Sequence, residues 1–298
     1  MIGKLDLYKV FCKVARCKSF SKAARDLYMT QPAVSQAIMQ LERELDTRLF
    51  NRTPKGVSLT NEGNLLFEYV YSAINLINVG EEKILEFKNL TTGELRIGVG
   101  DTIARYFLLP YFELFHNQYP NIKFKIVNGT TIELCSLLKS GEVDLVICNL
   151  PLEDSTLFIR SCIDIHDIFV CGKDYKHLVS TPKRLEELVK LPLILLERNS
   201  NSRKYVEDYM LSKGLQISPE IELGSHDLLL ELAKINLGIA CVTKEFSQEY
   251  INKGLLYEIP LIEEIPKRSI GVCSLKSVPL SPSSTKFVEI LERELKDE

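Results

Sequence analysis

The stretch SFSKAARDLYMTQPAVSQAIMQLERELDTRLF, residues 19–50, decides the fold of the first part of the chain. Ser19 and Ser21 are both suitable N-caps for the short helix that follows them. After a brief turn, Thr30 caps a second helix with Pro32 in its first turn, where the missing N–H costs nothing. Two short helices joined by a tight turn predict a helix-turn-helix, an arrangement that places one helix in the major groove of DNA.

The second of these helices has an inner and an outer face. Val34, Ile38, Leu41 and Leu45 recur at helical spacing and form one apolar stripe that we expect to be buried. The opposite face is mostly polar, and the N-terminal residues of such a helix reach the edges of bases. We therefore expect bases to be read by Gln31, Pro32, Ser35, Gln36 and Met39.

The residues around this helix complete the expected DNA contacts. Residues 49–59 predict two short strands joined by a turn, which together form a wing. Positions at the helix starts and on the wing suit contacts to phosphates or the minor groove. This second set is Ser21, Lys22, Thr30, Arg52 and Lys55. The alternative for all these side chains is an ordinary solvated surface.

Charge is distributed unevenly along the chain. Residues 1–60 carry 11 lysines and arginines against 5 acidic residues, whereas the whole chain of 298 residues carries 37 against 40. The first segment is therefore basic and the remainder acidic. This asymmetry predicts that only the first segment meets a polyanion.

Residues 61–89 predict one long helix that ends in a hinge at 89–93. Its apolar residues recur in steps of four and three, which is typical of a coiled-coil seam. The seam consists of Leu66, Val70, Ala73, Ile77, Gly80, Ile84 and Phe87. We expect the chain to dimerise through it. The alternative is a helix that packs on its own domain.

Beyond residue 93, predicted strands alternate with helices, which indicates parallel sheets with crossover helices. About 205 residues of this kind suggest two α/β lobes with a cleft at the carboxyl ends of the strands. The expected fold class is thus α plus α/β. The expected domains are a helix-turn-helix over 1–60, a linker over 61–92 and a two-lobed domain over 93–298, with lobe I at about 93–163 and 266–298 and lobe II at about 164–265.

Polar segments beside the predicted strands and helix starts mark a candidate ligand site. Such turns supply hydroxyls, amides and backbone N–H groups that favour anions. The candidates are Gly100, Asp101, Thr102, Thr130, Thr131, Asn149, Ser200, Ser202, Arg203 and Ser225. Each hydroxyl also suits an N-cap, and Arg203 suits either an anion or a surface ion pair. Asp101 is unusual beside an anion and would instead favour an amine.

The motifs of residues 19–63 resemble those of the LysR-type transcriptional regulators of bacteria. They share a Ser-Phe-x-x-Ala-Ala-x-x-Leu opening, a Thr-Gln-Pro-Ala-x-Ser core, a Leu-Glu-x-x-Leu segment that leads to Leu-Phe-x-Arg, and a Leu-Thr-x-x-Gly end. Two residues depart from the pattern. Asp46 stands where the family has glycine, which suggests a different helix end, and Gln36 stands where arginine is common, which suggests a different base preference.

The resemblance implies more than the first domain. It implies a winged helix-turn-helix, a linker helix and an effector domain similar to type 2 periplasmic binding proteins. It also implies a homodimer or homotetramer that binds promoter DNA, contacts RNA polymerase and responds to a small metabolite between its lobes. A protein partner or a redox change in place of the metabolite remains an alternative.

Other classes of protein find little support in the sequence. Glycine-rich nucleotide loops, hydrolase motifs and metal-ligand spacings are missing from it, so no catalytic residue, metal or cofactor is expected. There is no export signal or long apolar run, which predicts a cytoplasmic protein without a membrane segment. The eight cysteines lack a CxxC pair and are expected to be reduced, with Cys162 and Cys171 as a less favoured redox pair.

Overall fold

The computed structural model of the protein describes residues 4–53, 56–88 and 93–297. Contacts divide the chain into two compact units. The first consists of Met1–Leu85 with Lys139–Glu142, and the second of Glu86–Leu138 with Val143–Glu298. No helix in the described ranges is long and apolar enough to cross a membrane.

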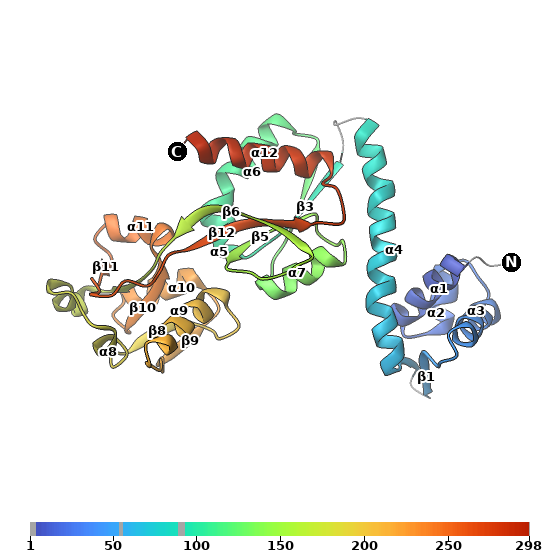
Figure 1. Cartoon of the computed structure of the whole chain (residues 1–298), viewed down its shortest axis with the longest axis horizontal. Helices are drawn as coiled ribbons and strands as arrows, with labels where there is room; N and C mark the ends of the chain where they lie inside the picture. The colour runs from blue at the N-terminus through green and yellow to red at the C-terminus, as the bar shows by residue number, and fades with distance from the viewer. Residues whose placement is uncertain (1–3, 54–55, 89–92, 298) are drawn as a thin grey trace. The chain divides into compact units, whose positions relative to one another are not determined.

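The first unit is a small helical head followed by a long helix (Figure 1). Its elements are α1 Lys4–Cys17, α2 Phe20–Asp26, α3 Gln31–Glu44, β1 Phe50–Thr53, β2 Gly56–Leu59 and α4 Asn61–Lys88. Ser19, not Ser21, caps α2, because its side chain accepts a hydrogen bond from the backbone N–H of Lys22. The two wing strands pair antiparallel, as the sequence predicts.

The apolar stripe of α3 forms much of the core of the head. Val34, Ile38 and Leu41 are at most 1% exposed and pack among the apolar side chains of α1 and the wing. Leu45 does not belong to this core, and the prediction is wrong for it. It is the C-cap of α3 and is 36% exposed, because the chain turns away from the helix axis there.

At the end of α3, Asp46 adopts the backbone conformation expected of the glycine that is usual at this position in the LysR-type pattern. Its φ is +48°, in the left-handed region where glycine is favoured and aspartate is among the better-tolerated alternatives. The amide of Thr47 then bonds to the carbonyl of Glu42 at 3.0 Å, which closes the helix end. The helix stop therefore has the conformation that a glycine would give.

The acidic residue that follows Leu41 ties α3 to the wing. Glu42 Oε1 accepts hydrogen bonds from the backbone amides of Leu49 at 2.8 Å and Phe50 at 3.3 Å. Thr60 fixes the start of α4 in a similar manner, since its hydroxyl accepts from the amide of Gly63 at 2.9 Å. Short polar contacts thus hold α3, the wing and α4 in one unit.

The long helix α4 divides its apolar residues between two faces. Leu66 and Val70, the first two seam residues, pack against the core of their own head. Leu65 and Tyr69 are instead 60% and 72% exposed. Further along, the outer face carries the exposed residues Ala73, Ile77, Gly80 and Ile84. The side chain of Phe87 and the predicted hinge residues 89–92 lie outside the described residues.

Within the described residues, the second unit contains two five-stranded sheets. The first sheet has the order β4-β3-β5-β12-β6 and the second the order β11-β7-β10-β8-β9. The elements of the first lobe are β3 Gly93–Val99, α5 Asp101–Ile103, a π-helical turn Ala104–Leu108, α6 Leu109–Gln118, β4 Ile122–Val127, α7 Thr131–Lys139, β5 Leu145–Leu150, β6 Leu157–Ile165, β12 Arg268–Leu275 and α12 Pro282–Asp297.

The second lobe has the same layered construction, with helices packed beside its sheet (Figure 1). Its elements are β7 Asp167–Cys171, a 3-10 helix Lys173–Ser180, α8 Leu185–Leu188, β8 Leu193–Leu196, α9 Asn201–Ser212, β9 Ile221–Leu223, α10 His226–Lys234, β10 Ile239–Thr243, α11 Lys244–Asn252 and β11 Tyr257–Glu258. The chain passes between the sheets at His166 and returns at Arg268.

The sheets are mixed, so the expectation of parallel sheets holds for only some of the strand pairs. In the first sheet β12 runs antiparallel to β5 and β6, and in the second β7 runs antiparallel to β10 and β11. The antiparallel strands are the ones that carry the chain between the two sheets. A parallel pair of strands needs a crossover connection, usually a helix, and these strands are joined without one. The strand β6 was not predicted from the sequence.

Candidate functional site

The head presents the N-terminal end of α3 as an open polar surface. Thr30 caps the helix, and its hydroxyl accepts from the amide of Ala33 at 3.4 Å. The structure places all five base-reading candidates beyond this cap on the side away from the core. Gln31, Pro32, Gln36 and Met39 are exposed and Ser35 is half-buried.

The flanking candidates are only partly described. Ser21 and Lys22 are exposed on α2, next to the same surface in sequence. The side chain of Arg52 and the whole of Lys55 lie outside the described residues. Tyr28 was not among the candidates, although it is 99% exposed at a φ of +54° in the turn before Thr30. The sequence feature that could have drawn attention to Tyr28 is an aromatic residue in a turn where glycine or asparagine is favoured.

The second unit contains a cavity of about 410 Å³, within the usual size range of small-molecule sites. Residues from both lobes line it, and they come from segments that follow strands or begin helices. The structure brings together here eight of the ten ligand candidates: Gly100, Asp101, Thr102, Thr130, Thr131, Asn149, Ser200 and Ser202.

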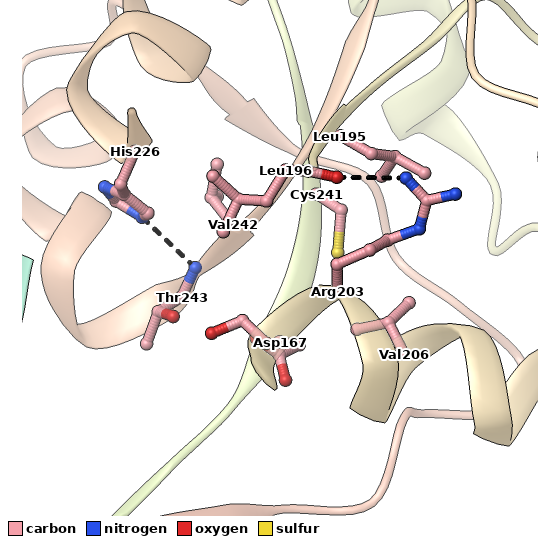
Figure 2. Close-up of a pocket in the computed structure, with 10 residues that line it drawn as sticks. Asp167, Leu195, Leu196, Arg203, Val206, His226, Cys241, Val242 and Thr243 are labelled. Atoms are coloured by element: carbon pink, nitrogen blue, oxygen red, sulfur yellow. Dashed lines mark hydrogen bonds between the residues drawn. The ribbon is translucent and has the colours of Figure 1, made fainter. Parts of the chain in front are cut away.

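The remaining two candidates have structural contacts instead. Arg203 is 2% exposed, and Figure 2 shows its guanidinium turned toward the carbonyl of Leu196, to which it donates at 3.0 Å. It also pairs with Glu222 at 3.2 Å, so its charge is compensated inside the lobe. Ser225 caps α10 by accepting from the amide of Leu228.

Two carboxylates on the first-lobe wall of the cavity are held by neighbouring polar groups. Thr130 and Glu133 form a capping box at the start of α7, because Glu133 Oε2 accepts from the amide and hydroxyl of Thr130 at 2.8 Å each. The backbone hydrogen bond, and then the side-chain one, lowers the pKa of Glu133. Asp101 accepts a hydrogen bond from the side-chain amide of Asn128.

An arginine that the sequence reasoning missed donates hydrogen bonds to three side chains of the cavity wall, although it does not line the cavity itself. Arg268 is 5% exposed and forms a two-pronged ion pair with Asp167, at 2.5 and 2.8 Å. Its Nη1 donates to Asn149 of the first lobe, and Nη2, which also binds Asp167, donates to Ser202 and Thr243 of the second. The guanidinium therefore connects both lobes at the point where β12 crosses between them.

His226 was also missed, and it lies beside this network. It is 4% exposed, and burial lowers its pKa to about 4, so the imidazole is neutral near pH 7. Figure 2 shows the backbone N–H of Thr243 donating to His226 Nε2 at 3.4 Å. The ring proton is thus on Nδ1, which has no hydrogen-bond partner among the described residues.

Metal and thiol chemistry find little support in this geometry. No cluster of histidine, cysteine and acidic residues in the described parts of the chain could hold a metal ion. All eight cysteines fall in the described ranges and are free thiols. Burial raises the pKa of Cys162 and of Cys171 to about 11, and the two belong to different sheets. The redox pair that the sequence left as a less favoured alternative stays a prediction, and a mass shift after mild peroxide would test it.

Two family models match the chain and together cover nearly all of it. The model of the bacterial regulatory helix-turn-helix protein, lysR family, matches residues 5–64. The model of the LysR substrate binding domain matches residues 88–296.

Similar proteins and structures agree with these matches. A "Probable RuBisCO transcriptional regulator" of Emiliania huxleyi is 27% identical and covers 90% of this chain and 87% of that protein. The HTH-type transcriptional activator CmpR of a Synechocystis strain is 26% identical, over 80% of this chain and 78% of that protein. Full-length OxyR from Pseudomonas aeruginosa has a similar fold, with a TM-score of 0.69 and 19% identity. The match covers 99% of this chain and 95% of that one. CbnR in complex with its target DNA also has a similar fold, with a TM-score of 0.65 and 18% identity. The match covers 98% of this chain and 99% of that one.

Proposed function

The chain belongs to the LysR family of bacterial DNA-binding transcriptional regulators, and on this premise we propose that it reads its operator through α3 and answers to a small molecule in the cavity of the second unit. The observation that carries the proposal is the pairing of an exposed polar helix face on a helix-turn-helix with a ligand-sized cavity between two lobes. We further propose that it works in the cytoplasm, on promoter DNA, and in contact with RNA polymerase.

In the proposed complex, the N-terminal end of α3 lies in the major groove. Gln36 is exposed there and offers an amide that pairs in two-pronged fashion with adenine. Pro32 and Met39 offer apolar contacts to a thymine methyl group. Lys22 on α2 contacts phosphate and supplies affinity without sequence information.

Gln36→Ala tests this assignment. We expect the preference at one base position to fall by about 1–3 kcal/mol, because the amide that pairs with the base is removed. The slope of log affinity against log salt should stay the same, since no phosphate contact is lost. The measurement is binding to a set of operator variants at several salt concentrations.

Lys22→Ala is the matched control for that experiment. This variant should bind all operator variants more weakly by the same factor, and the slope of log affinity against log salt should fall by about one. An unchanged base preference in Gln36→Ala would remove Gln36 from the base-reading set.

We propose that two chains pair through the outer face of α4. Tyr69, Ala73, Ile77, Gly80 and Ile84 share one side of the helix and are exposed, which leaves apolar area for a second copy. Two heads held together in this manner would bind a two-fold symmetric operator. Further contacts between second units would give a tetramer.

Replacing both Ile77 and Ile84 by aspartate should weaken the dimer by at least about 100-fold, because unpaired charges would be buried in the contact. Sedimentation equilibrium of the full chain measures this. Glu68→Ala, on another side of the same helix, should leave the dissociation constant unchanged. A double aspartate variant that remains as tightly dimeric as the parent would contradict the proposed surface.

The effector half of the proposal has its own test. The unfolding temperature of the full chain should rise by several degrees in the presence of a small-molecule extract of cells, if one component binds the cavity of the folded protein. The same extract should alter the DNase footprint on the operator, since a ligand that prefers one lobe arrangement shifts its population. If the extract changes neither measurement, control by a small molecule is refuted.

A further inference from the structure

The charges on the cavity wall have one sign. Asp101, Glu133 and Glu197 line it, and all three are exposed to solvent. Among the described lining residues there is no lysine or arginine. The rest of the wall consists mostly of hydroxyls, amides and a few apolar side chains. An anion in this cavity would meet like charges without a compensating cation.

Two of the helix starts at the cavity are already served by the protein's own carboxylates, whereas the start of α9 has no acidic residue in its first turn and no side-chain cap from Ser200. The N-terminus of α7 receives Glu133 through the capping box with Thr130. Asp101 lies in the first turn of α5, where it accepts from Asn128. Acidic side chains at these positions neutralise the positive end of a helix. The wall therefore differs from the anion site that the polar turns predicted.

Three arginines of the second unit near these residues also pair with carboxylates. Arg268 is bound to Asp167, and Arg203 lies between Glu222 and Glu207, at 3.2 and 3.5 Å. Arg198, which follows Glu197 in the chain, is 3.9 Å from Glu222. None of these three side chains lines the cavity in the described structure.

A buried polar group on the same wall has a donor to spare. His226 is 4% exposed and lines the cavity, and its Nδ1 lacks a hydrogen-bond partner in the described ranges. A buried donor without a partner is rare in a folded protein and calls for an acceptor. The cavity between the lobes, and not this nitrogen, identifies the binding site, and the carboxylates on its wall determine the sign of the ligand.

We propose that the effector is a small organic amine, protonated at neutral pH, which also carries hydroxyl or carbonyl groups. Its ammonium group binds between Asp101 and Glu197, and its uncharged polar groups bind the hydroxyls and amides of the wall. This inference rests on the proposed function, because it names the chemical class of the ligand that controls DNA binding.

The test uses probes of matched shape and different charge. One set is putrescine, 1,4-butanediol and succinate, and a second is glucosamine, glucose and glucuronate. Thermal unfolding of the full chain is measured with each probe at millimolar concentration. The cell extract that tests the proposed function is also separated on cation- and anion-exchange resins, and each fraction is assayed.

We expect an amine of these sets, or the fraction retained by the cation exchanger, to raise the unfolding temperature. For the purified active compound, Asp101→Asn and Glu197→Gln should each weaken binding by about tenfold, which corresponds to about 1.4 kcal/mol. Glu186→Gln, an exposed acid on α8 away from the cavity wall, should leave binding unchanged.

Each other outcome has a definite meaning. If the active material is an anion or an uncharged compound, the amine class is wrong while control by a small molecule stands. If the amine binds equally well to the Asp101→Asn and Glu197→Gln variants, the assignment of the site is wrong. If neither a probe nor a fraction has any effect, the amine proposal and the proposed effector function fail together.

Discussion

Asp167→Asn is expected to cost about 3–5 kcal/mol in the free energy of unfolding of the second unit, because it leaves the charge of Arg268 buried without a partner. Both side chains of the pair are at least 97% buried, and Arg268 makes two hydrogen bonds to the carboxylate. The amide of asparagine replaces one acceptor but not the negative charge. Urea unfolding followed by circular dichroism measures the loss.

Two further variants separate the buried charge from simple disturbance of the fold. The double change Asp167→Leu with Arg268→Met should recover a large part of the stability, since both charges are then removed. Glu263→Gln breaks the exposed ion pair with Lys213 and should have little effect, because water screens that pair. A loss for Asp167→Asn as small as that for Glu263→Gln would show that the Arg268 pair does not hold the lobes together.

The sequence predicts best the parts of the chain whose contacts are local. Three of the four stripe residues of α3, the cap at Thr30 and the strand at residues 122–127 follow from spacings within one or two turns or one strand, and the structure has them as expected. The polar turns of the cavity were found in the same manner, because each follows a strand or begins a helix.

The features that were missed depend on distant residues. Asp167 and Asn149 are 101 and 119 residues from Arg268 in sequence, so no periodicity connects them. The sign of the cavity was missed because it depends on the ion pair that neutralises Arg203 and on the capping box of Glu133. The long-helix seam was only half understood, since Leu66 and Val70 serve their own head while Ile77 and Ile84 stay exposed.

Gly63→Ala should have the second large effect, on the head. A Cβ at this position would lie 2.1 Å from the carbonyl oxygen of Leu49, and backbone at that distance cannot move aside without shifting the wing. The amide of Gly63 is also bound to the Thr60 hydroxyl, which holds the first turn of α4 in place. We expect a loss of at least about 3 kcal/mol, at the upper end of what overpacking costs.

Gly80→Ala is the matched control on the same helix. Nothing within the same chain lies within 4 Å of a Cβ built at Gly80, which is exposed on the face of α4 proposed above for dimerisation. The comparison therefore uses the free energy of unfolding of the monomer, below the dissociation constant of the dimer. The same substitution should therefore stabilise the chain by about 0.5–1 kcal/mol, because alanine favours the helix more than glycine does. Urea unfolding and operator binding of both variants check the pair. Equal stability of Gly63→Ala and Gly80→Ala would contradict the close approach of α4 to the wing, and with it the physical reason for the Leu-Thr-x-x-Gly motif.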